Sequence, residues 1–206
     1  MISHSNKFIF VCNMRVASQS ISKSLSPISI YADNHITAKE AKTGIPTSPA
    51  SIRLCSSDHI LQQKSSHWED YFTFAFVRDP YSHFLSTFFY LNKHRYKDTM
   101  TFSEYAKLQE STNYSSMSDW DFKGLFDRIS DDDGKVIVDF VGRMENMEKD
   151  WRYISEKCSL DGIELQHINY SMKGGIDDIN RYYTSKEKEI VRKLYHRDFE
   201  EFGYDR

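Results

Sequence analysis

Two short apolar runs, each followed at once by a helical pattern, narrow the choice of fold. The runs are residues 7–12 (KFIFVC) and residues 71–77 (YFTFAFV), and their length and composition are typical of buried strands. Strands that are apolar throughout and alternate with helices are typical of parallel sheets with helices on both faces. The sequence therefore predicts an α/β fold in three layers (α/β/α), with a mainly parallel central sheet.

The helical pattern after each run has recognisable ends. Residues 17–25 are compatible with a helix that Pro27 ends. Asp79 can cap a helix that starts at Pro80 and buries residues spaced at i, i+3, i+4 and i+7 (Tyr81, Phe84, Leu85 and Phe88). We expect further strands at residues 28–32, 136–141 and 163–169, and further helices after Thr37, Thr101, residue 146 and Thr184.

The size of the chain and its composition suit one globular domain over residues 1–206. Residues 43–67 are rich in Ser, Pro and Thr, which predicts a partly irregular insertion that contains one helix. The formal net charge of −3 argues against general nucleic-acid binding, which needs a broadly basic face, but it allows a local basic pocket for a small anion.

Cellular context can also be inferred from the sequence. Cys12, Cys55 and Cys158 are odd in number and widely spaced, which favours free thiols in a reducing compartment. There is no signal-peptide pattern, and no apolar run approaches the length of about 18 residues that a membrane helix needs. We therefore expect a cytoplasmic protein without a membrane segment. The sequence does not indicate the oligomeric state.

Residues 10–21 (FVCNMRVASQSI) join the first predicted strand to the first helix. At this place open α/β sheets bind phosphate groups, because backbone N–H groups and the helix dipole converge there. The stretch lacks the glycines and the Lys-Ser/Thr pair of a nucleotide-binding P-loop, so a phosphate ligand bound without a metal is favoured over ATP or GTP. A plain turn capped by Ser18 or Ser20 is the alternative.

A second motif, residues 74–91 (FAFVRDPYSHFLSTFFYL), follows the same logic. Arg78 ends the second strand, and Ser86 lies on the next helix, off the apolar stripe. An arginine can donate two hydrogen bonds to a phosphate, and the serine hydroxyl can add another. The alternative is an ion pair between Arg78 and Asp79 or a neighbouring carboxylate.

Together these residues resemble a known family. MRVASQSI resembles the phosphosulfate loop of sulfotransferases that use 3′-phosphoadenosine 5′-phosphosulfate (PAPS), of the carbohydrate-modifying Golgi type and the bacterial "sulfotransferase family 2" type. The motif around Arg78 is similar to their 3′-phosphate motif, and VDFVGRMENMEKDW and the ending YYTSKEKEIVRKLYHRDFEEFGYD fit the same pattern in order. The resemblance covers the chain except for about residues 43–66. It implies a P-loop-NTPase-like sulfotransferase fold.

The resemblance also implies roles for individual residues. It assigns the 3′-phosphate to Arg78 and Ser86, and the 5′-phosphosulfate to Arg15, Val16, Ala17, Ser18, Gln19 and Ser20. Arg15 stands where the family usually has lysine, and Asn13 and Met14 replace an aliphatic–proline pair. Arginine keeps the positive charge, so Arg15 is also a catalytic candidate that stabilises the leaving phosphate. His83, where arginine is common, is expected on the helix surface.

Sulfuryl transfer by in-line displacement also needs a base near the acceptor hydroxyl. His35 follows the expected strand at residues 28–32 and resembles the family's histidine in an H-x-[ST]-A-x-E context. His59, beside Asp58, is the alternative, and we interpret Glu145 as structural. Lys173, in the stretch MKGG, either reaches a phosphate from an anion-binding loop or belongs to a plain loop.

The predicted reaction uses PAPS as donor, with 3′-phosphoadenosine 5′-phosphate (PAP) as product, and requires no metal. The expected acceptor is a hydroxyl group of a carbohydrate or a glycosylated small molecule. Two alternatives stay open: a P-loop-like nucleotide kinase, and a catalytically degenerate protein that only binds a nucleotide or a sulfated ligand.

Overall fold

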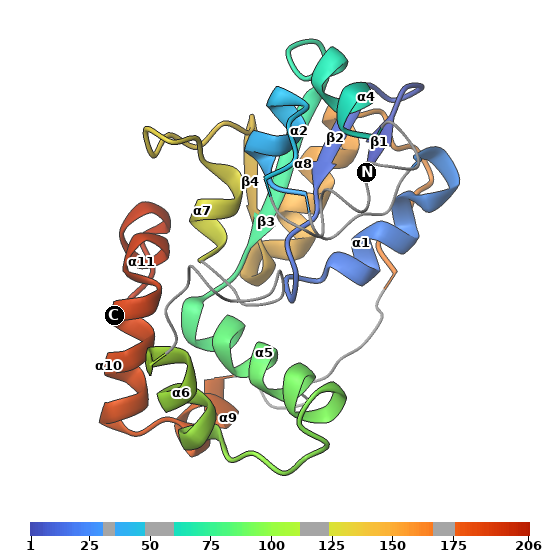
Figure 1. The fold of residues 1–206 in the computed structure, drawn as a ribbon. Helices are drawn as coiled ribbons and strands as arrows, with labels where there is room; N and C mark the ends of the chain where they lie inside the picture. The colour runs from blue at the N-terminus through green and yellow to red at the C-terminus, as the bar shows by residue number, and fades with distance from the viewer. Residues whose placement is uncertain (31–35, 48–59, 112–123, 167–175) are drawn as a thin grey trace. The chain divides into compact units, whose positions relative to one another are not determined.

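The structure, a computed structural model, describes residues 1–30, 36–47, 60–111, 124–166 and 176–206 (Figure 1). Contacts divide the chain into two compact units. The first, here called the sheet unit, consists of Met1–Val77 and Asp127–Asn169, and the second, the helical unit, consists of Arg78–Phe126 and Tyr170–Arg206. The expectation of one domain over residues 1–206 stays a prediction.

The sheet unit contains a four-stranded sheet in the order β1-β2-β3-β4. β1 (Ile2–Ser3) pairs antiparallel with β2 (Phe8–Val11). β2 pairs parallel with β3 (Phe72–Val77), and β3 pairs parallel with β4 (Phe140–Arg143). The chain thus has a mixed α/β structure whose described sheet is mainly parallel, as the two apolar runs predict.

Burial explains why the two runs are apolar throughout. All four residues of β2 are buried, and so are the last five residues of β3. The rings of Phe10 and Phe74 stack across the two strands, with centroids 5.1 Å apart. Side chains on both faces of these strands are therefore excluded from water, which is characteristic of strands inside a parallel sheet.

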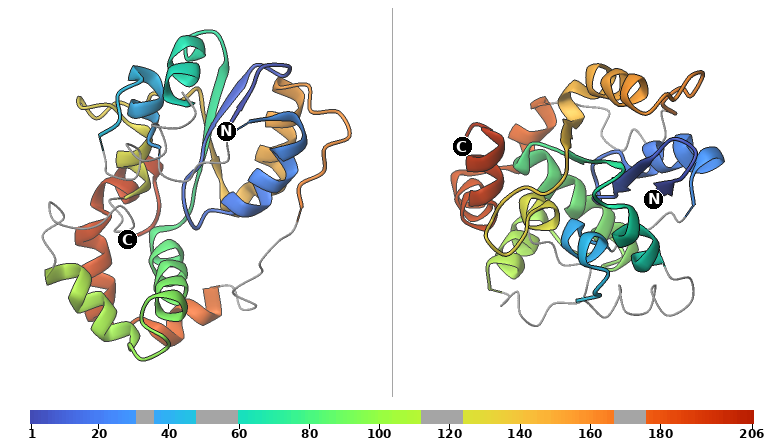
Figure 2. Two further views of the ribbon diagram at one scale, coloured as in Figure 1. Left: turned by 45° about the vertical axis from the view of Figure 1, so that its right-hand side comes forward. Right: turned by 90° about the horizontal axis from the view of Figure 1, so that it is seen from above.

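Helices lie on both sides of this sheet. α1 (Ser18–Leu25) and α8 (Met147–Lys157) are on one side, and α2 (Ala38–Thr43) and α4 (Ile60–His67) are on the other, as both views of Figure 2 show. The capping box expected after Thr37 is present at the start of α2. α4 is the helix expected within residues 43–67, of which residues 48–59 lie outside the described part of the chain.

The strand expected at residues 28–32 is wrong in its described part. Residues Ser26–Ile28 form the 3₁₀ helix η1, because Pro27 has the φ of a first helical turn and no N–H for a sheet. Ile30 forms an isolated antiparallel bridge with Ile2.

Two other expected strands differ from the structure. The strand expected at residues 136–141 begins later, at Phe140, and Val136 instead forms an isolated bridge with Ser130 across the turn that follows α7 (Leu125–Ile129). Residues 163–166 of the strand expected at 163–169 are irregular, and the rest lie outside the described residues. Apolar content alone therefore overestimates strand length here.

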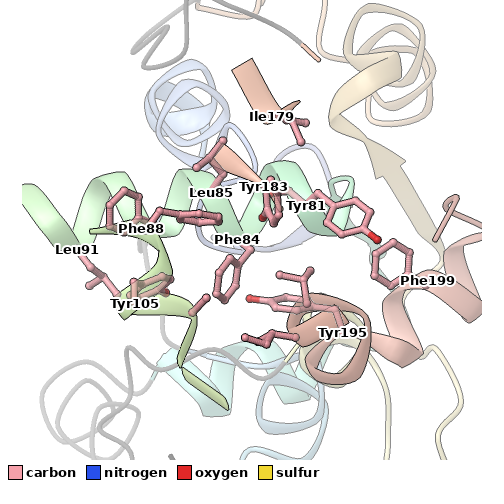
Figure 3. Packing of buried hydrophobic residues seen from close by; sticks show 14 residues of the cluster. Tyr81, Phe84, Leu85, Phe88, Leu91, Tyr105, Ile179, Tyr183, Tyr195 and Phe199 are labelled. Atoms are coloured by element: carbon pink, nitrogen blue, oxygen red, sulfur yellow. The ribbon is translucent and has the colours of Figure 1, made fainter. Parts of the chain in front are cut away.

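The helical unit contains α5 (Pro80–His94), α6 (Phe102–Ser111), α9 (Ile176–Tyr182), α10 (Ser185–Leu194) and α11 (His196–Phe202). Its core includes the stripe predicted on α5, which Figure 3 shows beside aromatic rings from α6, α11 and the segments that flank α10 (Tyr81, Phe84, Leu85, Phe88, Tyr105, Tyr183, Tyr195 and Phe199). The side chain of Asp79 accepts a hydrogen bond from the Ser82 N–H at 2.8 Å, which confirms the predicted cap.

Two polar groups organise the C-terminal part of the helical unit. The buried carboxylate of Asp198 accepts a hydrogen bond from the Phe126 N–H at 2.9 Å. Glu187 closes the predicted capping box with Thr184 and also accepts a hydrogen bond from Ser103 at 2.7 Å. Burial alone would raise the pKa of Glu187, but the hydrogen bonds from Thr184 and Ser103 outweigh it and lower the pKa to about 2.

Two of the three cysteines predicted to be free thiols lie in the described part of the chain. Cys158 is a buried free thiol, and burial raises its pKa to about 12 against the opposing charge of Lys157. Cys12 is buried with its Sγ 3.8 Å from the Ser22 hydroxyl, and Cys55 lies outside the described residues. Within the described part of the chain, no helix has the length and apolar character needed to cross a membrane.

Candidate functional site

The loop between β2 and α1 adopts the backbone of a glycine-rich loop without containing glycine. Arg15 has φ 62° and Ala17 has φ 58°, both in the left-handed region. This conformation costs a residue with a side chain roughly 1–2 kcal/mol, and it persists where the surroundings determine it strongly. The absence of glycine from residues 12–17 therefore does not prevent a tight loop at this place.

Buried side chains on either side of the strained residues hold the loop. Met14, Val16 and Ser18 are buried, whereas Arg15 and Ala17 between them are partly exposed. Buried side chains thus alternate with partly exposed ones through the loop and into the first residue of α1. The two residues with left-handed backbone are fixed between these buried side chains.

Asn13 provides a further anchor just before the loop. Its side chain is fully buried; Nδ2 donates to the carbonyl oxygen of Phe76 at 3.0 Å, and Oδ1 accepts from Nε of Arg128 at 3.1 Å. The amide thus connects the end of β2 with β3 and with α7. From the sequence, Asn13 is visible only as a departure from the family's aliphatic–proline pair.

The start of α1 corrects one alternative. Ser18 is the first helical residue, and the N-cap is Ala17, which makes no side-chain capping hydrogen bond. The prediction of a turn capped by Ser18 or Ser20 is therefore wrong. Of the remaining loop residues, Ser20 is buried and Gln19 is exposed.

The second motif is positioned by β3 and α5. Arg78 directly follows the last residue of β3 and is half-buried. Ser86 lies on α5 and is buried although it is off the apolar stripe. His83 is also fully buried, with its ring 5.8 Å from that of Tyr195, so the expectation that it lies on the helix surface is wrong.

The third motif, residues 138–151, connects β4 through the 3₁₀ helix η2 (Met144–Asn146) to α8. The N–H of Arg143, the last residue of β4, donates to the carboxylate of Asp150 at 2.7 Å. Gly142 leaves no room for a larger residue, because a Cβ there would lie 2.5 Å from the Phe76 ring. Asp150 thus binds the N–H at the end of β4. Glu145 is exposed, and its structural role stays a prediction.

Comparison with known families decides the classification. A sequence model described as "Sulfotransferase family" matches residues 2–205, nearly the whole chain. The chain belongs to the sulfotransferase family. It is also similar to an uncharacterized protein of Archaeoglobus fulgidus, with 29% identity over 96 residues, which are 45% of this chain and 72% of that protein. No solved structure matches the chain.

Family membership indicates an enzyme, a transferase of sulfuryl groups. The resemblance inferred from the motifs is confirmed at this level. For such an enzyme, three predicted residues are missing from the described part of the chain: His35, His59 and Lys173. Both candidate bases and the lysine therefore stay predictions. Among the described residues, no group of three or more His, Cys, Asp or Glu is arranged to hold a metal ion.

Proposed function

We propose that this sulfotransferase takes its sulfuryl group from PAPS and transfers it to a hydroxyl group of a carbohydrate or a glycosylated small molecule. The observation that carries the proposal is the loop at residues 12–17, which bends through two left-handed residues directly before a helix whose N-cap residue, Ala17, makes no side-chain capping hydrogen bond. Backbone N–H groups at such a helix start favour an anion. The three-layer, P-loop-NTPase-like architecture belongs to the same proposal and is supported by helices on both sides of the sheet.

In the proposed arrangement, Arg15, Val16, Ala17, Ser18, Gln19 and Ser20 bind the 5′-phosphosulfate, and Arg78 and Ser86 bind the 3′-phosphate. Lys173 adds a positive charge for a phosphate. Arg15 is partly exposed, which leaves its side chain accessible to a ligand from solvent. Its guanidinium would stabilise the negative charge that develops on the leaving phosphate.

The chemistry assigned to the chain is one displacement. The acceptor hydroxyl gives its proton to His35, or to His59 as the alternative, while its oxygen forms a bond to sulfur. The bond between sulfur and the bridging phosphate oxygen breaks, and PAP leaves with the electron pair. The protein supplies alignment, a base and charge stabilisation, and this mechanism needs no metal.

Calorimetric titration with PAP and with ATP, each with and without Mg²⁺, tests the donor. We expect PAP to bind more tightly than ATP and to bind equally well without Mg²⁺, because the ligand is held by backbone N–H groups and arginines. ATP binding that is tighter than PAP binding and requires Mg²⁺ would contradict the proposal and favour the kinase.

A transfer assay with radiolabelled PAPS and a panel of glycans completes this test. Transfer of label to a hydroxyl-bearing glycan is the expected result. Tight PAP binding without transfer to any member of the panel would instead support the degenerate, ligand-binding protein, for which the replacement of the family's lysine by Arg15 is the specific reason.

A further inference from the structure

The amide of Asn13 makes two different hydrogen bonds inside the sheet unit. It donates to a backbone oxygen of β3 through Nδ2 and accepts from the guanidinium of Arg128 through Oδ1. Asparagine offers a donor and an acceptor at the two ends of one planar group, whereas an ionised aspartate only accepts and leucine does neither. Because the side chain is fully buried, losing either bond would leave a buried polar group unsatisfied.

Asn13 lies between the end of β2 and the strained loop, so its hydrogen bonds also affect the loop. The backbone pairing of β2 with β3 ends at Val11 and Ala75, and the Asn13 amide adds one more hydrogen bond to β3 beyond that pair. Arg15, the first residue with a left-handed backbone, is only two residues further along the chain. The amide therefore fixes the backbone where it leaves the sheet and turns into the strained loop.

We infer that Asn13 is a positioning residue for the anion-binding loop. By holding the backbone before Arg15 against β3 and α7, it keeps the Arg15 side chain and the N–H groups at the start of α1 in place before the ligand arrives. A loop ordered in advance does not lose conformational entropy on binding, so its contribution to affinity is larger. The inference rests on the proposed function, because it assigns the 5′-phosphosulfate to this loop.

Two variants and one control separate positioning from general stability. Asn13→Leu removes both hydrogen bonds and keeps the branching and the number of heavy atoms of the side chain. Arg128→Lys replaces the guanidinium, and with it the Nε donor, by an ammonium group. Thr73→Val is the matched control, because the buried Thr73 hydroxyl also makes two hydrogen bonds, both with Asp139, at the opposite end of β3. All three variants should lower the melting temperature.

The decisive measurement is the Kd of two nucleotides, one with a 5′-phosphosulfate and one with a 3′-phosphate. A purely structural role of Asn13 would not change one Kd without the other. For Asn13→Leu we expect the Kd of adenosine 5′-phosphosulfate to rise by up to about tenfold, because binding must then order the loop and one lost hydrogen bond corresponds to about that factor at most. The Kd of adenosine 3′-phosphate should not change. Arg128→Lys should show a smaller loss of the same selectivity, and Thr73→Val should change neither Kd.

Unchanged binding of adenosine 5′-phosphosulfate by Asn13→Leu, or equal losses for both nucleotides, would overturn the inference. If Asn13→Leu does not fold, the selectivity of Arg128→Lys decides in the same way. If the wild-type protein binds neither nucleotide, the proposed function fails, and hydrogen exchange of residues 14–18 decides on Asn13. Faster exchange in Asn13→Leu than in Thr73→Val supports positioning, and equal exchange refutes it.

Discussion

At the scale of single residues, the loop at residues 12–17 shows how a backbone usually associated with glycine is obtained from other residues. Arg15 and Ala17 take left-handed conformations, and the buried side chains of Asn13, Met14 and Val16 hold them there. A glycine-rich loop reaches the same conformations at no steric cost, but it is less restricted in the unfolded and unliganded states. The loop of this protein therefore has backbone strain at two residues, but its conformation is more restricted than that of a glycine-rich loop.

Ala17→Gly tests this strain. Glycine removes the steric cost of the left-handed backbone, roughly 1–2 kcal/mol, but raises the entropic cost of folding by about 0.4–1 kcal/mol. We therefore expect a net stabilisation of about 0–1.6 kcal/mol. Urea unfolding measures it. The control, Ala106→Gly in α6, should cost about 1 kcal/mol or more, because Ala106 is a buried residue of a helix. A similar loss for both variants would contradict strain at Ala17.

At the scale of elements, local signals in the sequence predict most of the described structure. The strands β2 and β3 follow from continuous apolar runs, and the helices α2 and α10 follow from their capping boxes, because each signal and its structure involve neighbouring residues. The same holds for the cap of α5 at Asp79.

Features that depend on distant residues escaped prediction. Asn13 bonds to residues 63 and 115 positions away, so no local pattern shows its role. The burial of His83 depends on how α5 packs against Tyr195. The apolar residues Val191, Leu194, Tyr195 and Phe199 predict one helix after Thr184, yet the structure divides it at Tyr195 into α10 and α11. The candidate loop was predicted, but what holds it in place was not.

The capping box of α10 makes one element sensitive to acid. Glu187 has a pKa of about 2 in the folded protein, below the ordinary value of 4.5, so the unfolded chain takes up its proton first. The stabilisation is therefore complete above about pH 4.5 and is lost as the pH falls toward 2. Melting temperatures of the wild type and Glu187→Gln should differ most at neutral pH and converge over this range.

Glu104→Gln is the control for that prediction. Glu104 caps α6 through Thr101 in the same way, and hydrogen bonds from Thr101 lower its pKa, but its side chain is exposed. Water screens an exposed group, so its variant should show a weaker pH dependence. If both variants show the same pH dependence, the hydrogen bonds of Glu187 with Thr184 and Ser103 do not make stability more sensitive to acid than an exposed capping box does.

At the scale of the whole molecule, the proposed function requires motifs far apart in the sequence to act on one nucleotide. The 5′ end is assigned to the loop after β2, and the 3′-phosphate to Arg78 after β3 and Ser86 on α5. The family match over residues 2–205 includes all of these segments. The proposal therefore predicts that each motif recognises its own end of the ligand.

Arg78→Ala tests this division. An arginine that donates to a phosphate contributes charge-assisted hydrogen bonds, so we expect PAP affinity to fall by roughly 10- to 100-fold while the affinity for adenosine 5′-phosphosulfate stays the same. Calorimetry with both ligands measures the difference. The control, Arg152→Ala, removes an exposed arginine from α8 and should affect neither ligand. Equal losses for both ligands in Arg78→Ala would show that Arg78 does not recognise the 3′-phosphate.

The side-chain anchoring of the loop at residues 12–17 also has a kinetic consequence. A receptor that already has its bound shape does not wait for a rearrangement, so encounters with a small anion succeed at a rate close to that set by diffusion. Differences in affinity between ligands of this loop then arise from how long each one stays. Residence time, rather than speed of capture, becomes the quantity that substitutions around Arg15 alter.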